Sequence, residues 1–234
     1  MYEQHIIVDF EMNPVSPKYP DMANLLHREI IEIGAVRINS RGEKVDSFSC
    51  FIKPQYNIGI SRFVNKLTGI RSCDIMKAPS FEEAVSRFSD WVGNKKTRVY
   101  SWSDSDLRQL KTECEIKSVV FPFNMRRWID LQQLYPRLMK IETPKNLMSL
   151  EDAATWYGLE FSYGKAHRAI YDAKMTAELL QPILTGEYIT QRENINRNVH
   201  LKPDEHTGFK LGDIYADMFN QLFGQIQCEP EFAR

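Results

Sequence analysis

The sequence predicts an α/β domain with a mixed β-sheet, and three observations support this fold class. Residues Ile6 to Val8 form an apolar run that is typical of a strand buried on both faces. Two β-rich segments lie on either side of Ser40–Gly42, which is a turn signal, so a hairpin is expected. Further along the chain, strand and helix patterns alternate, as they do in proteins that layer helices on a sheet.

The N-terminal part of the chain is expected to supply three strands. The first covers residues 4–11 and is followed over residues 12–24 by a segment with three prolines, which is expected to be a loop. The β-rich segments 28–39 and 44–54 then form the two arms of the hairpin.

The following residues are expected to alternate helices with short strands. Ser80 is a candidate N-cap for a helix whose apolar residues recur at helical spacing. Ser149 caps a second helix that Gly158 ends, and residues 167–184 form the last strong helix. The remaining expected elements are a strand at 97–103, a helix at 105–116, and a strand and helix over 126–139 that Pro136 interrupts.

A domain boundary is expected near residue 185. Residues 1–184 contain 25 basic and 23 acidic side chains, a balance of +2, whereas residues 185–234 contain 5 and 8, a balance of −3. Within this C-terminal extension, residues 214–226 keep an i, i+4 apolar rhythm that predicts an amphipathic helix. Packing on the core is one use for such a helix, and a homodimer or partner contact is the other.

Composition excludes several classes of protein. With 234 residues, 26% of them charged, the chain is typical of globular proteins, and no stretch of about 20 apolar residues predicts a membrane span. The N-terminus has no basic lead, so no secretory signal is expected. The four scattered cysteines favour reduced thiols and a cytoplasmic protein, with a disulfide or zinc framework as the alternative. A net charge of −1 argues against binding long duplex DNA by bulk electrostatics, but not against gripping a few phosphates through metal ions.

An acid pair on the first strand is the first feature that suggests chemistry. Asp9 and Glu11 are two residues apart, so both side chains leave one face of the sheet, about 6–7 Å apart. Two carboxylates this close repel each other and require metal ions, basic partners or raised pKa values, unless both lie solvated at a strand edge.

A second acidic feature follows the strand at 97–103. Asp104 and Asp106 lie at the junction with the next helix, where acids are also common helix caps. Such a junction lies at an end of the sheet, where α/β proteins often bind ligands.

A third feature opens the last helix. His167 and Asp172 are five residues apart, about 140° around an ideal helix, and cannot share one face of it. If both serve one site, His167 must lie just ahead of the helix and Asp172 in its first turns. The alternative is a surface histidine and an acid that the helix dipole favours.

In order and spacing, these three features resemble the motifs of the DEDDh 3′–5′ exonucleases. The resemblance covers about residues 4–184 and includes the segments "REIIEIGAVRI" and "NKLTGI". The middle motif, "SWSDSDLRQL", is most similar to the KapD-type and Eri-like branch, whose better-known eukaryotic members trim RNA 3′ ends. The resemblance implies a ribonuclease H-like fold, a five-stranded mixed sheet with helices on both faces, here with a C-terminal helical extension.

The resemblance also implies the roles of the candidate residues. Asp9, Glu11, Asp106 and Asp172 would bind two Mg²⁺ or Mn²⁺ ions, and His167 would be the general base. Asp104 competes with Asp106, which is preferred because the family's middle acid is followed directly by an apolar residue and a helix, as Asp106 is by Leu107. The implied activity is release of nucleoside 5′-monophosphates from the 3′ ends of single-stranded RNA or DNA, with RNA modestly favoured.

Contacts to the substrate strand are expected from a second set of residues. Met12, Leu67 and Thr68 resemble family positions near the terminal nucleotides, and Trp102 is a candidate for stacking on a base, with a core position as the alternative. Candidate phosphate contacts, each with solvated surface as the alternative, are Lys165, Arg168, Arg126 and Arg127.

Two other functions are compatible with the same sequence. One is a catalytically silent nucleic-acid-binding or regulatory module on the same fold, which would usually have lost one member of the acid and histidine set. The other is a phosphatase or a different metal hydrolase.

Overall fold

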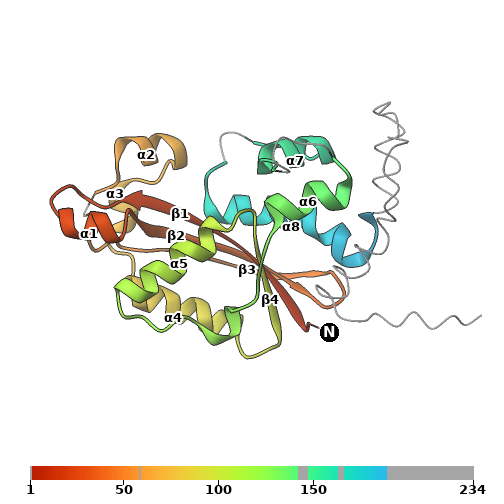
Figure 1. Cartoon of the computed structure of the whole chain (residues 1–234), viewed down its shortest axis with the longest axis horizontal. Coiled ribbons are helices and arrows are strands. Elements are labelled where there is room, and N and C mark those ends of the chain that lie inside the picture. Colours follow the sequence, from red (N-terminus) through yellow and green to blue (C-terminus); the bar gives the residue numbers. More distant parts are fainter. Residues whose placement is uncertain (1, 58, 142–146, 163–165, 189–234) are drawn as a thin grey trace, which may run out of the picture.

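A five-stranded mixed sheet forms the centre of the fold (Figure 1). The computed structural model describes residues 2–57, 59–141, 147–162 and 166–188. The order of the strands across the sheet is β3-β2-β1-β4-β5. The strands are β1 (Gln4–Pro14), β2 (Arg28–Asn39), β3 (Lys44–Phe51), β4 (Thr97–Ser101) and β5 (Trp128–Asp130).

The central strand β1 has neighbours of both directions. It pairs antiparallel with β2 and parallel with β4. The antiparallel pair β2–β3 is the predicted hairpin, closed at Asn39, whose N–H donates to Glu43 O at 2.9 Å, with Gly42 in the left-handed region at φ 81°. The parallel pair β4–β5 completes the sheet, so the predicted fold class is confirmed.

Helices cover both faces of the sheet. The capping predicted at Ser80 and Ser149 is confirmed, since each hydroxyl oxygen accepts a backbone N–H three residues on, at 3.2 and 3.0 Å. The helices are α1 (Pro20–Leu25), α2 (Arg62–Thr68), α3 (Ser72–Ile75), α4 (Phe81–Val92), α5 (Ser105–Ile116), α6 (Leu131–Met139), α7 (Leu150–Tyr157) and α8 (Ala169–Thr185), with a 3₁₀ turn at Phe123–Met125.

The alternation of β1 decides which face its acids occupy. Ile6, Val8 and Phe10 pack in an apolar cluster with α4 and α5, whereas Ile7 packs on the other face with α6, α7 and α8 (Figure 1). Because side chains alternate along a strand, Asp9 and Glu11 share the face of Ile7 and lie on the side of α8.

A segment that was expected to be a loop contains a helix, and another helix includes part of the "NKLTGI" segment. β1 extends to Pro14, and α1 begins with Pro20. A proline suits the first turn of a helix because the N–H that it lacks would have no acceptor within the helix. The "NKLTGI" segment contributes to α2, which Ser61 caps and Gly69 ends at φ 73°. The three prolines of residues 12–24 were interpreted as loop residues, although a proline also suits the first turn of a helix.

Helix α6 continues through Pro136 instead of being interrupted by it. A proline removes one backbone hydrogen bond in a helix. Here Leu134, Tyr135 and Leu138 are buried on both sides of it, and this packing holds the turn together.

The described cysteines Cys50, Cys73 and Cys114 are free, as expected. Of the helices in the described ranges, none combines the length and apolarity needed to cross a bilayer. The predicted helix at 214–226 lies outside the described residues, and both it and the boundary near residue 185 stay predictions.

Candidate active site

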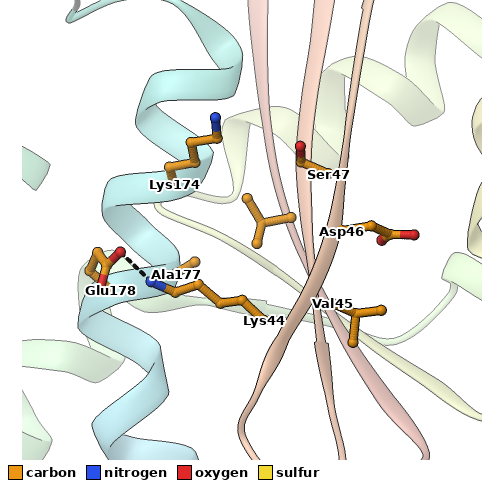
Figure 2. Close-up of a pocket in the computed structure, with 8 residues that line it drawn as sticks. Lys44, Val45, Asp46, Ser47, Lys174, Ala177 and Glu178 are labelled. Carbon is orange, nitrogen blue, oxygen red and sulfur yellow. Dashed lines mark hydrogen bonds and ion pairs between the residues drawn. The ribbon is translucent and has the colours of Figure 1, made fainter.

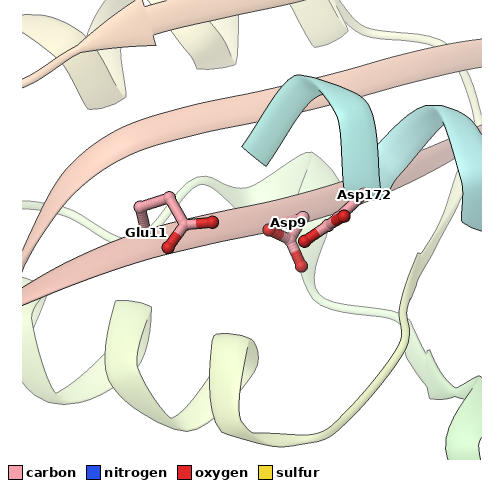
Figure 3. Close-up of side chains that lie close together, drawn as sticks. All are labelled: Asp9, Glu11 and Asp172. Atoms are coloured by element: carbon pink, nitrogen blue, oxygen red, sulfur yellow. The ribbon is translucent and has the colours of Figure 1, made fainter. Parts of the chain in front are cut away.

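Three carboxylates from distant parts of the chain converge on the α8 side of the sheet (Figure 3). Asp9 and Glu11 come from β1 and Asp172 from the first turn of α8. One oxygen of each lies within 4.8 Å of the others. Asp9 is half-buried and the other two are each 9% exposed, so little water screens their mutual repulsion.

Asp106 joins this group from the other edge of β1, and the four acids are called the acidic centre below. Because β4 ends at Ser101 while β1 continues, Phe10 lies beyond the part of β1 that pairs with β4. Its N–H instead donates to Asp106 Oδ1 at 3.1 Å. Asp106 is 4% exposed. Asp104, in contrast, is exposed and pairs with Arg108 at 2.6 Å, so the structure brings Asp106 and not Asp104 to the centre.

Burial raises the pKa values of all four acids, and repulsion by neighbouring carboxylates of the centre adds to this at Asp9 and Glu11. Burial raises the pKa of Asp106 and of Asp172 to about 7. The pKa of Glu11 rises to about 9 through burial and then through repulsion by nearby carboxylates. Burial, followed by repulsion from Asp106, raises the pKa of Asp9 well above its ordinary value. Like charges held this close indicate a site for a cation.

The donor set fits a hard divalent ion. Carboxylate oxygens are the ligands that Mg²⁺ and Mn²⁺ prefer. In addition, Asp172 Oδ1 is buried and has no hydrogen-bond partner among the described residues. A buried carboxylate oxygen normally has a partner, so an oxygen without one beside Asp9 and Glu11 fits a metal ligand.

His167 lies ahead of the last helix, the position expected if His167 and Asp172 serve one site. It immediately precedes the N-cap residue of α8, whereas Asp172 lies in the first turns of the helix. His167 is exposed, has the left-handed value φ 59°, and donates its backbone N–H to Asp172 Oδ2 at 3.2 Å. The small side chains of Ala169 and Ala173, both fully buried, let α8 lie close to the sheet.

The structure leaves some of the expected substrate contacts at the surface and buries others. Met12 is half-buried at the end of β1, and Leu67 is 41% exposed on α2, so both present surface. Thr68 is 5% exposed, and its hydroxyl donates to Val64 O at 2.8 Å and accepts the N–H of Ile70 at 3.0 Å, so it stabilises the end of α2.

Trp102 is not available for stacking on a base. It is 7% exposed in the core, where its Nε1 donates to Met148 O at 2.9 Å and its ring lies 5.6 Å from that of Tyr135. The prediction of a substrate contact there was wrong, because the chain from α6 and the loop before α7 cover the end of β4.

The basic candidates also have other partners. Arg127 Nη1 donates to the phenol oxygen of Tyr2 at 3.0 Å, near the start of β1 and away from the acids. Arg126 lies over the ring of Phe123, 4.5 Å from its centroid. Arg168 is paired with Glu32 at 2.9 Å, and Lys165 lies outside the described residues.

Glu32 is the residue near the site to which the sequence analysis gave no role. It lies in β2 directly opposite Glu11 and is fully buried. The signal was present, since one charged residue inside the apolar segment "IIEIGAV" must have a partner to be buried. The partner, Arg168, is distant in sequence and could not be paired with it in advance.

A separate groove of about 270 Å³ lies between β3 and α8 (Figure 2). Its lining includes Lys44, Ser47, Lys174 and Glu178, and Lys44 is paired with Glu178 across it. None of the four acids lines this groove, so the candidate active site is the acidic centre.

Comparison with known proteins gives a consistent result. ERI1 exoribonuclease 2 from Danio rerio is 30% identical over 224 residues, which are 86% of this chain and 39% of the relative. The human 3'-5' exoribonuclease 1 is 24% identical over 188 residues, covering 76% of this chain and 51% of the relative. The chain thus spans about 39–51% of the length of these relatives.

The fold is shared with solved nuclease structures. The nuclease domain of 3'hExo, a DEDDh family member bound to rAMP, superimposes with a TM-score of 0.68 at 24% identity, covering 79% of this chain and 93% of that one. A family model described as an exonuclease, RNase_T, matches residues 6–180. This match spans β1 to α8, including all four acids and His167, and the chain therefore belongs to the RNase_T exonuclease family.

Proposed function

We propose that this protein is a metal-dependent 3′–5′ exonuclease that removes nucleoside 5′-monophosphates from single-stranded nucleic acid, with RNA preferred over DNA. The observation that supports this most is the convergence of Asp9, Glu11 and Asp172 within 4.8 Å, in a chain that belongs to an exonuclease family. The names of the curated relatives, which are exoribonucleases, support RNA as the substrate and the 3′ end as the site of attack.

The acidic centre would hold two Mg²⁺ or Mn²⁺ ions. Asp9, Glu11 and Asp172 would be direct ligands, and Asp106 would act through water, because one of its oxygens already accepts the N–H of Phe10. Such ions, when bound, lower the pKa of water and stabilise charge on the entering and leaving oxygens of a phosphodiester. Four carboxylates offset the charge of two divalent cations.

His167 would act as the general base. A histidine side chain has an ordinary pKa near ~6.5 and can accept a proton from water at neutral pH. Its exposed position ahead of α8 supports this role, since the side chain is accessible while its backbone is tied to Asp172. The proton would pass from the attacking water to the imidazole as the water oxygen bonds to phosphorus and the P–O3′ bond breaks, and the leaving 3′ oxygen would take a proton from solvent.

Digestion of matched RNA and DNA oligomers, each labelled at the 3′ end, tests this function. With Mg²⁺ or Mn²⁺ we expect release of labelled 5′-mononucleotide, faster from RNA, and none with chelator. The control is Asp9→Asn combined with Asp172→Asn, which removes two charges from the centre at little change in volume.

Three results would contradict the proposal. Binding of the oligomer without release of nucleotides in either metal would indicate a catalytically silent module. Hydrolysis of a mononucleotide phosphate without shortening of oligomers would indicate a phosphatase. Equal activity in the double variant would show that the acidic centre does not carry the reaction.

A further inference from the structure

Glu32 is a fifth carboxylate beside the acidic centre, and its contacts differ from those of the four acids. It lies opposite Glu11 in the antiparallel pairing of β1 and β2 and has no exposed surface. A carboxylate in this position must either bind a cation or be hydrogen-bonded by donors from the protein.

Among the described residues, the donors to Glu32 come from the start of α8. Glu32 Oε1 accepts from Arg168 Nη2 at 2.9 Å. Oε2 accepts from Arg168 Nε at 3.1 Å and from the backbone N–H of Ala169 at 3.2 Å. Both oxygens are therefore engaged by the fork of the guanidinium and by the first N–H of the helix, a geometry that fixes direction as well as distance.

Two residues further along β2, Gly34 faces the same side of the sheet. A Cβ at Gly34 would lie 2.1 Å from the carbonyl carbon of Ala169 and 2.2 Å from Ile170 N. Glu32 thus binds the start of α8 at the point where Gly34 lets the helix backbone touch the sheet.

The backbone that these contacts hold is that of His167. Its φ of 59° is uncommon for a residue other than glycine, and such a conformation persists only where surrounding contacts hold it. The N–H of His167 donates to Asp172 Oδ2. The next two residues, Arg168 and Ala169, donate to Glu32. His167 is therefore fixed between two carboxylates.

We propose that Glu32, through Arg168, is a positioning residue that holds His167 in the geometry needed for proton transfer, and that it is not a metal ligand. This inference rests on the proposed exonuclease function. Outer hydrogen-bond partners of catalytic groups of this kind commonly contribute about 10–100-fold to activity.

Steady-state kinetics of Glu32→Gln and Arg168→Gln on a 3′-labelled RNA oligomer with Mn²⁺ test the proposal. The amide introduced by Glu32→Gln would turn an NH₂ toward one of three donors, so the pair with Arg168 is lost at almost constant volume. We expect kcat to fall about 10–100-fold in each variant while KM and the Mn²⁺ binding midpoint change by less than about 2-fold. Arg168→Lys should recover part of the loss, and Arg108→Gln, at an exposed ion pair on α5, is the matched control.

Combination with His167→Ala separates positioning from structural support. If Glu32 acts through His167, Glu32→Gln should cost little in the His167→Ala background, because the group it positions is already gone. A full additional loss there, or weaker Mn²⁺ binding by Glu32→Gln, would overturn the proposal. Should Glu32→Gln fail to fold, Arg168→Gln gives the same test, since that side chain is 38% exposed. Inactivity of the unmodified protein would instead refute the exonuclease function itself.

Discussion

Gly34 and Ala169 are in such close approach that no side chain fits between them. A Cβ at Gly34 would lie 2.1 Å from the carbonyl carbon of Ala169, well below any real contact distance. Gly34 is also the residue paired with Asp9 across β1 and β2. The absence of a side chain at Gly34 therefore sets α8, and with it Asp172, beside Asp9.

Gly34→Ala should displace α8 from the sheet. We expect a loss of about 1–3 kcal/mol in the free energy of unfolding, which is typical of overpacking, together with weaker Mn²⁺ binding as Asp172 moves from Asp9. Urea unfolding and calorimetry measure the two effects. The control is Gly59→Ala, where the new Cβ would lie at an ordinary 3.6 Å from Ser72 Oγ. Unchanged Mn²⁺ affinity in Gly34→Ala would show that α8 is not held in place by this contact.

His167→Ala should lower kcat by roughly 10²–10⁴-fold, the range usual for a general base, because no other group near the start of α8 is assigned to take the proton. The same variant should bind Mn²⁺ normally, since the bond from His167 to Asp172 Oδ2 is made by the backbone N–H, which alanine keeps. Rates from 3′-labelled RNA and a Mn²⁺ titration check both statements. Equal turnover would remove the proposed role.

Asp104 and Asp106, the two acids of the middle motif, give a matched pair of variants. Asp106→Asn removes a charge beside Asp9 and should lower activity by about 10–100-fold, whereas Asp104→Asn should have little effect. Asp104 is exposed and loses only a surface ion pair with Arg108, worth about 0–1 kcal/mol. Parallel rate measurements with Mg²⁺ decide between them, and the reverse order would assign the middle position to Asp104.

Metal-free protein should become less stable as pH rises. The pKa of Asp106 and Asp172 is raised from 3.8 to about 7, and that of Glu11 from 4.5 to about 9. The folded state then binds more protons than the unfolded chain between roughly pH 4 and 9, so the stability that the protonated acids contribute is lost across this window.

Thermal unfolding in chelator and in Mn²⁺ measures this effect. The Tm in chelator should fall from about pH 5 to about pH 9, and the rise caused by Mn²⁺ should be larger at about pH 8 than at about pH 6, because fewer protons must be displaced. In Asp9→Asn, which removes one of the repelling charges, the fall should be shallower. If the Tm in chelator changes with pH by the same amount in Asp9→Asn and in the unmodified protein, the effect comes from groups outside the acidic centre.

A buried ion triad holds α5 against the start of β2. Lys117 Nζ bonds Glu29 at 2.8 Å and Glu113 at 2.7 Å, and these side chains are at most 5% exposed. Lys117→Met should cost about 3–5 kcal/mol in urea unfolding, because two carboxylates lose their counter-charge. Arg87→Met, at the exposed pair with Glu83, should change stability by less than about 1 kcal/mol. Equal costs would show that burial of the triad does not matter.

Features that depend on neighbouring residues could be predicted from the sequence. Alternation along β1 placed Asp9 and Glu11 on one face, and the angle between His167 and Asp172 required the histidine to precede its helix. Helix caps at Ser80 and Ser149 were equally local. In each case the geometry of a single strand or helix fixes the relation, so no distant contact has to be known.

Contacts between distant segments were decided by the tertiary structure. Trp102 could equally have been a stacking surface until α6 and the residues before α7 were placed over it, and Arg168 could have been a phosphate contact until β2 presented Glu32. The sequence determined the strand that carries the acids, the order of the motifs and the types of residue that are proposed to bind metal. Only the packing of α8 against Gly34 and Glu32 decided that these acids meet, because the free energy of that contact depends on shape and charge between segments more than 130 residues apart.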